Sequence, residues 1–172
     1  LLIEVVLLRV LPSVAFSGIF YALAGFRREF VALVRFLFAA ALASADSALV
    51  SAAISVCLPR RPGAASMISV VVLFMFLLVS GLQINLNKVP DGLRWLPAIS
   101  FGRHAFEIML STELDGEDVR VEVPGAPPVD VKADIVLGVI GLNASRTSQN
   151  FLALCAIGVI LVALTSGVLV LQ

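Results

Sequence analysis

Long runs of apolar residues, separated by short polar or charged segments, organise this chain. Four runs are long enough to cross a bilayer as helices, because about 20 residues rising ~1.5 Å each span the ~30 Å hydrocarbon layer. These runs occupy residues 10–26, 37–58, 64–86 and 151–171. We therefore predict an all-α membrane protein, a bundle of four transmembrane helices.

The connecting segments predict how these helices follow one another. Only Pro-Arg-Arg-Pro-Gly separates the second and third runs, and its prolines and glycine break a helix, so these two helices are expected to be antiparallel neighbours. A long loop, residues 87–150, precedes the last run. Two signals for orientation disagree: the glycosylation sequon at Asn143 favours an extracytoplasmic loop, whereas the arginines of the first loop favour the opposite side.

Composition agrees with a membrane protein. Hydrophobic residues make up 60% of the chain, charged residues 14%, and the mean hydropathy is +1.06. A soluble domain of this length needs a far more polar surface. The net charge of zero gives no electrostatic basis for binding nucleic acid.

The chain shows no catalytic motif. GxxxxGK[ST], HExxH and GxSxG are all absent. His104 has no cysteine or second histidine nearby in the sequence, so we expect no metal site. If the protein uses ATP, the ATP must be bound outside this chain.

Asp46 lies near the middle of the second apolar run. A carboxylate there costs about 2.5–3.5 kcal/mol on insertion scales, so its side chain should face protein or water rather than lipid. It could line a translocation path, or it could be held in helix packing, and the residues favour neither. The serines of the same run are expected to serve close packing and to bond backbone carbonyls.

The third run carries a face formed by Phe74, Leu77 and Gly81. Such a face usually packs against other helices, but it could also form an apolar wall for a substrate. Beyond this run, residues 101–114 predict a short amphipathic helix with Arg103 and Glu107 one turn apart. This helix is too short to cross the bilayer, so we expect it to lie at the headgroup level or to pack on the bundle.

Three stretches of the chain resemble a known family. They are LPSVAFSGIFYALAGF, SGLQINLNKVPDGLRWLPAISFGRHAFEIMLSTELDG and the final apolar run. They are similar to the C-terminal part of the transmembrane domain of G-subfamily (White-type) ABC transporters. The most specific feature is the order SGL-x-x-NL, a proline turn, Trp-Leu, Ile-Ser, and a helix containing Arg-x-x-Phe-Glu.

The resemblance implies an architecture for the whole protein. Residues 1–172 would be part of a six-helix domain, preceded on the same polypeptide by a nucleotide-binding domain that holds ATP and Mg²⁺. A second half-transporter, identical or different, would complete a dimer around a central path. The loop 87–150 would be extracytoplasmic, in a plasma or organelle membrane, and its helix would be re-entrant.

The resemblance also implies roles for particular residues. Phe74 and Leu77 would face the cavity, and Leu82 and Gln83 would stand at a hydrophobic plug where the SGL motif ends the helix. The re-entrant helix would carry the family motif with the residues Arg103, His104, Phe106 and Glu107. The loop has no cysteines, unlike the loop of the multidrug member of the family, and Asp46 has no counterpart in the pattern.

These observations leave three functional hypotheses. The first is the membrane part of an ATP-driven exporter of lipids, sterols or amphipathic small molecules. The second is an ATP-independent channel or ion-coupled carrier that uses Asp46 and the re-entrant segment. The third is a membrane subunit that serves assembly alone.

Overall fold

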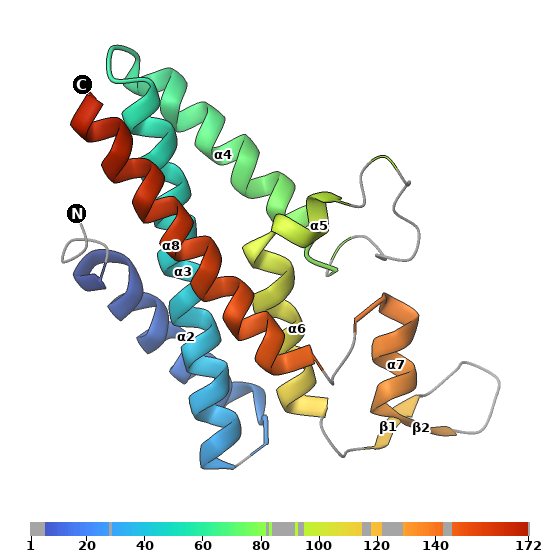
Figure 1. Cartoon of the computed structure of the whole chain (residues 1–172). Helices are drawn as coiled ribbons and strands as arrows, with labels where there is room; N and C mark the ends of the chain where they lie inside the picture. The colour runs from blue at the N-terminus through green and yellow to red at the C-terminus, as the bar shows by residue number, and fades with distance from the viewer. Residues whose placement is uncertain are drawn as a thin grey trace.

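The structure is a computed structural model of the chain. The residues that it describes are 6–27, 29–81, 83, 92, 95–114, 118–121, 129–142 and 146–171. Elements below carry the labels of Figure 1, which shows a bundle of long helices with smaller elements beside one end.

Each of the predicted apolar runs forms a helix. A short π-helix, η1 (Val6–Val10), leads directly into α2 (Leu11–Ala24). The other three are α3 (Phe30–Cys57), α4 (Pro62–Leu78) and α8 (Thr147–Leu171). Within the described residues, three stretches are long and apolar enough to cross a membrane: Leu7–Ala24, Phe30–Cys57 and Thr147–Val170. The predicted all-α membrane bundle is confirmed, while the number of four spans stays a prediction because α4 is shorter.

The third helix ends earlier than predicted. The apolar run continues to residue 86, but α4 stops at Leu78. The amides of Val79 and Ser80 turn back to the carbonyls of Met75 and Leu77, and the Ser80 hydroxyl donates to Leu77 at 2.7 Å. Gly81 then adopts a φ of 92°, which a side chain would disfavour. The turn at these residues therefore ends α4.

Proline and glycine set the other helix boundaries as expected. Pro62 stands in the first turn of α4, where its missing N–H costs nothing. Gly25 ends α2 with a φ of 70°, in the left-handed region that glycine tolerates. The Pro-Arg-Arg turn joins α3 to α4, which pack against each other as predicted neighbours.

The amphipathic helix of the long loop is present with the predicted bounds. This helix, α6 (Phe101–Leu114), packs against both α3 and α8 (Figure 1). Its apolar residues Phe101, Ala105 and Ile108 are buried. They belong to a core cluster with Ala39 and Val50 of α3 and Leu154 of α8. Of the two expected positions, packing on the bundle is the one observed.

The rest of the described loop contains more structure than the sequence predicted. The short helix α5 (Trp95–Ile99) precedes α6. Beyond α6, the strands β1 (Asp118–Val121) and β2 (Val129–Lys132) pair antiparallel, with Asp118 opposite Lys132, and α7 (Ala133–Ile140) follows. In Figure 1 this small unit lies beside the end of α6, away from α4.

Ser100 joins the end of α4 to the start of α6. This fully buried residue donates its hydroxyl to the Phe76 carbonyl at 3.0 Å and accepts the Arg103 amide at 3.4 Å, as a helix N-cap does. Ser100→Ala is expected to lower stability by about 1–2 kcal/mol, because it removes the cap and leaves a buried carbonyl without its donor. The measurement is thermal unfolding of the full-length protein in nanodiscs.

Ser66→Ala provides the matched control for this prediction. The Ser66 hydroxyl is exposed and bonds only the Pro62 carbonyl of its own helix. Its removal should change stability by less than about 0.5 kcal/mol. Equal losses for the two variants would show that Ser100 does not hold α4 to α6.

Candidate functional site

Two of the predicted substrate-path residues, Phe74 and Leu77, lie on an outward face of α4. Phe74 is 57% exposed and Leu77 is 46% exposed, whereas the buried residues of α4 are the small Ala65 and Ser69. Gly81, at the end of this face, is buried, and Gln83 is exposed. Leu82 lies outside the described residues. The structure thus brings Phe74 and Leu77 together on one apolar surface.

A cavity of about 500 Å³ lies beside this face, lined by residues of η1, α3 and α4. Small residues line most of it, among them Ser51 and Ser55 of α3 and Ser66 and Ser69 of α4. The hydroxyls of Ser51, Ser66 and Ser69 donate to backbone carbonyls of their own helices. The expected backbone bonding of the α3 serines is therefore confirmed at Ser51, and the charged Arg9 also lines the cavity.

Asp46 is held between helices rather than beside the α4 face. Its side chain is 2% exposed, as expected for a carboxylate that avoids lipid. It approaches α8 so closely that a Cβ on Gly158 would lie 2.8 Å from Oδ1. Oδ2 has no hydrogen-bond partner among the described residues. The structure does not bring Asp46 together with Phe74 and Leu77, and its predicted role in a path stays a prediction.

The polar residues of α6 tie this helix to its neighbours. Arg103 and Glu107 form the predicted i,i+4 pair, with Nε and Oε2 3.9 Å apart and Glu107 buried. His104 bridges two other elements: Nδ1 lies 2.9 Å from Asn150 Oδ1 of α8, and Nε2 lies 3.0 Å from the Ala98 carbonyl of α5. Asn150 was not predicted, because nothing in the sequence pairs it with residue 104.

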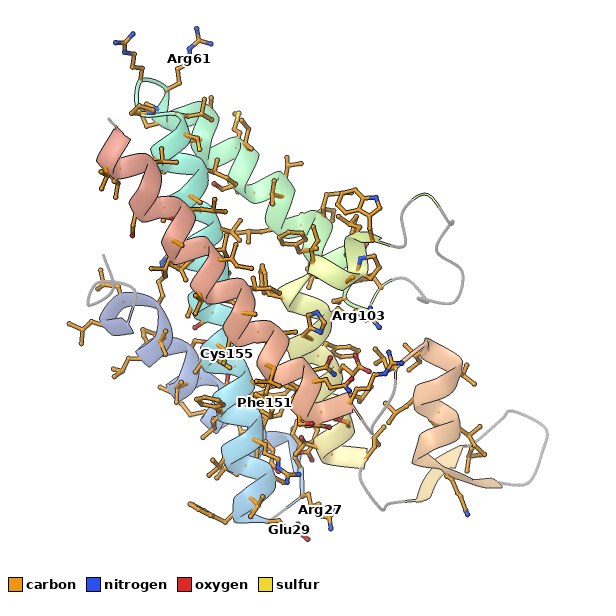
Figure 2. All side chains as sticks on the ribbon, viewed as in Figure 1. Arg27, Glu29, Arg61, Arg103, Phe151 and Cys155 are labelled. Atoms are coloured by element: carbon orange, nitrogen blue, oxygen red, sulfur yellow. The ribbon has the colours of Figure 1, made fainter. Side chains whose placement is uncertain are left out.

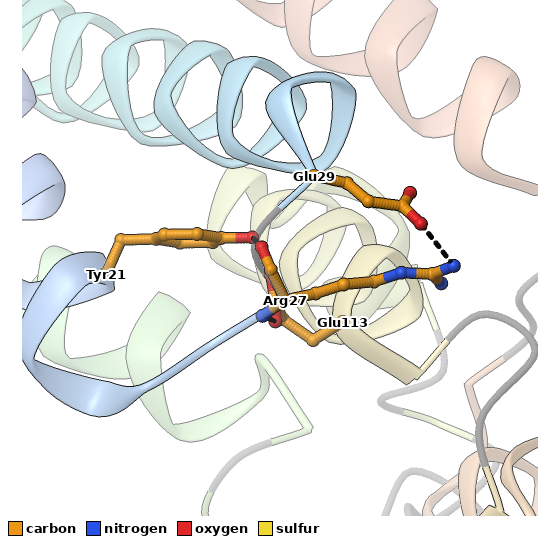
Figure 3. Close-up of polar contacts among 4 residues, drawn as sticks. All are labelled: Tyr21, Arg27, Glu29 and Glu113. Carbon is orange, nitrogen blue, oxygen red and sulfur yellow. Dashed lines mark hydrogen bonds and ion pairs between the residues drawn. The ribbon is translucent and has the colours of Figure 1, made fainter.

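A second polar cluster, also not predicted, closes the end of the bundle where α2 meets α3. The Tyr21 hydroxyl donates to the Arg27 carbonyl at 2.6 Å, and the Arg27 amide donates to Glu113 Oε2 of α6 at 3.0 Å (Figure 3). The Arg27 guanidinium pairs with Glu29 at 2.7 Å. Phe106, half-buried on α6, lines an apolar groove next to this cluster.

Several exposed charges lie at the two ends of the bundle, whereas Asp46 and Glu107 are buried between helices. Figure 2 shows Arg61 beyond one end, at the α3–α4 turn, and Arg27 and Glu29 at the other. Between these ends, the outward side chains of α2, α3, α4 and α8 include many large apolar residues. Such a surface suits hydrocarbon or another membrane helix and would be a liability in water.

Comparison with known proteins agrees with this architecture. The family model described as ABC-2 type transporter matches residues 1–114. One similar protein is ABC transporter G family member 24 of Dictyostelium discoideum, which is 29% identical over 143 residues. The match covers 83% of this chain but only 12% of that relative, so the chain spans a small part of the relative's length.

The family match includes α2, α3, α4 and α6, which packs against α3 and α8. The relative extends the likeness over most of the chain. The apolar helices make it an integral, multi-pass membrane protein. The chain therefore belongs to the ABC-2 type transporter family, as a transmembrane domain of the G type.

Proposed function

We propose that this chain forms part of the conduit of an ATP-driven exporter that moves lipids, sterols or amphipathic small molecules. The observation that carries the proposal is the exposed apolar face of α4, with Phe74 and Leu77, in a membrane domain of this family. A face of this kind can bind a largely apolar molecule by contact area.

The energy for transport would come from outside the chain. A nucleotide-binding domain upstream on the same polypeptide would bind ATP and Mg²⁺. A second half-transporter, as a homodimer or heterodimer, would place its own α4 face across the path. In this arrangement the extracytoplasmic side would hold Arg27, Glu113 and the β1–β2 unit. The sequon at Asn143, which is outside the described residues, would lie on the same side.

The test uses the full-length protein in proteoliposomes, with a fluorescent phospholipid and a fluorescent sterol as probes. We expect ATP-dependent movement of at least one probe, and we expect Phe74→Ala to slow it several-fold, because the variant removes much of the contact area on α4. The matched control is Phe16→Ala on α2, which should transport at the normal rate, because Phe16 is also exposed, at 71%, and lies outside the α4 face.

Two outcomes would contradict the proposal. Flux that follows an ion gradient without ATP, and that Asp46→Asn abolishes, would favour a channel or carrier. Unchanged flux in both Phe74→Ala and Leu77→Ala, with normal folding and dimerisation, would favour a role in assembly alone.

A further inference from the structure

The cavity lined by η1, α3 and α4 lies near the end of the bundle that carries Arg61. Its volume of about 500 Å³ is within the range of small-molecule sites. Ser55 of α3 and Ser66 of α4 line it, and each lies within about one helical turn of the end of its helix at the α3–α4 connection. Figure 2 shows Arg61 beyond this end, where an exposed charge belongs at the lipid headgroups. The cavity therefore extends from the headgroup level into the bilayer.

This cavity is a different surface from the apolar face of α4. The buried residues of α4, Ala65 and Ser69, line the cavity, whereas Phe74 and Leu77 do not. Helix α3 and the η1 segment supply the other walls. A molecule bound here would lie between these elements rather than along the proposed transport path.

Arg9 of η1 brings a positive charge to the cavity. Among the described residues it makes no ion pair and no hydrogen bond. None of the described residues that line the cavity is acidic. A guanidinium in a membrane segment is stabilised by a partner of opposite charge, because lipid chains solvate it poorly. A lipid phosphate is available near this level, and the planar fork of an arginine can bind it with two hydrogen bonds.

The serines of the cavity offer hydrogen-bond acceptors. Ser51, Ser66 and Ser69 each donate their hydroxyl hydrogen to a backbone carbonyl of their own helix, at 3.0, 3.1 and 2.8 Å. A hydroxyl that donates in this way keeps a lone pair with which it can accept a further bond. A ligand that uses these oxygens must therefore carry O–H or N–H groups.

We propose that this cavity binds an anionic phospholipid with a hydroxylated headgroup, its phosphate on Arg9 and its headgroup hydroxyls on the serines. Leu8 and Val70, which line the cavity and are 66% and 67% exposed, would contact the acyl chains. Basic pockets between transmembrane helices bind acidic headgroups through the same electrostatic attraction. Phosphatidylglycerol and phosphatidylinositol both carry the required phosphate and hydroxyl groups.

The experiment measures binding of the first lipid to the full-length protein in detergent, without ATP, by native mass spectrometry. Three lipids with identical dioleoyl chains are titrated: phosphatidylglycerol, phosphatidylmethanol and phosphatidylcholine. Phosphatidylmethanol keeps the anionic phosphate but has no headgroup hydroxyl, and phosphatidylcholine has no net charge. We expect phosphatidylglycerol to bind about threefold more tightly than phosphatidylmethanol, the effect of one modest hydrogen bond, and about tenfold more tightly than phosphatidylcholine.

Two pairs of variants locate the binding in this cavity. Arg9→Gln should weaken phosphatidylglycerol binding about tenfold, and Arg9→Lys should retain most of it because the charge remains. The matched control is Arg61→Gln, because Arg61 is exposed at the same end but does not line the cavity, and it should bind as before. Ser51→Ala should reduce the preference for phosphatidylglycerol over phosphatidylmethanol. Ser44→Ala, on the same helix outside the cavity, should keep that preference.

Three results would overturn the inference. These are equal binding of the three lipids, equal losses in Arg9→Gln and Arg61→Gln, and displacement of the lipid by equimolar water-soluble glycerophosphoglycerol, which would assign the site to free phosphate esters. The comparison of lipids needs no variant, so it tests the inference even if Arg9→Gln does not fold. None of these readouts depends on transport, so a protein that moved neither fluorescent probe could still bind the phospholipid here.

Discussion

Leu154→Ala is expected to destabilise the helical bundle by about 2–3 kcal/mol, the largest effect of any single truncation considered for this chain. Leu154 is 0% exposed and lies in the core cluster where α8 meets α3 and α6. In a membrane, transfer from water contributes little between helices, so most of this cost comes from lost contacts and the cavity that remains.

Leu152→Ala is the matched control for Leu154→Ala. Leu152 stands two positions earlier on the same helix and is 71% exposed. The same chemical change there should shift stability by less than about 0.5 kcal/mol. The measurement is thermal unfolding of both full-length variants in nanodiscs of one lipid. Comparable losses at the two positions would mean that α8 does not pack on α3 and α6 through this face.

Gly158→Ala is expected to cost about 1–3 kcal/mol, because the added methyl group would lie 2.8 Å from Asp46 Oδ1. Asp46 is short and buried, so its carboxylate must rotate within the packed core or α3 must shift from α8. The matched control is Gly167→Ala on the same helix, where a Cβ would meet nothing within 4 Å. That control should be neutral or slightly stabilising, since alanine favours a helix.

A double-mutant cycle then identifies the cause of the Gly158 effect. If the clash with the carboxylate is responsible, Asp46→Ala should relieve it, and Gly158→Ala should cost at least about 1 kcal/mol less in that background. The readout is the same unfolding measurement. A cost that is unchanged by Asp46→Ala would place the clash elsewhere on α3.

The bundle helices could be predicted because the bilayer leaves few choices. In hydrocarbon every backbone group must be bonded within the segment, so a long apolar run has to be a helix. The end of α4 was not predicted, because the run was extended to residue 86 while the backbone turns at Ser80 and Gly81. The serine–glycine pair favours a turn at this point. The hydropathy of the surrounding residues favours a longer helix, and the prediction followed the hydropathy.

The polar contacts could be predicted only where they are local. Arg103 and Glu107 are one turn apart, so the periodicity of a helix places them together. Glu113 accepts a hydrogen bond from the backbone of residue 27, and His104 bonds Asn150. These residues are far apart in the sequence, so only the three-dimensional packing of the helices shows that they pair. In the sequence, Gly158 likewise resembles any glycine of an apolar run. Only the structure shows that it faces Asp46.

The β1–β2 pair was missed for a different reason. Each strand is four residues long, and the two are separated by a Pro- and Gly-rich stretch that reads as a loop. Short strands gain most of their stability from the neighbours they pair with, not from their own composition.

The early end of α4 has a consequence for the surrounding lipid. Its 17 residues extend about 25 Å at 1.5 Å per residue, a few ångströms less than a typical hydrocarbon thickness of about 30 Å. A helix that is too short for its bilayer draws the two leaflets together or is relieved in a thinner membrane. This hydrophobic mismatch would make the protein sensitive to acyl-chain length and favour its retention in thin membranes over sterol-thickened ones.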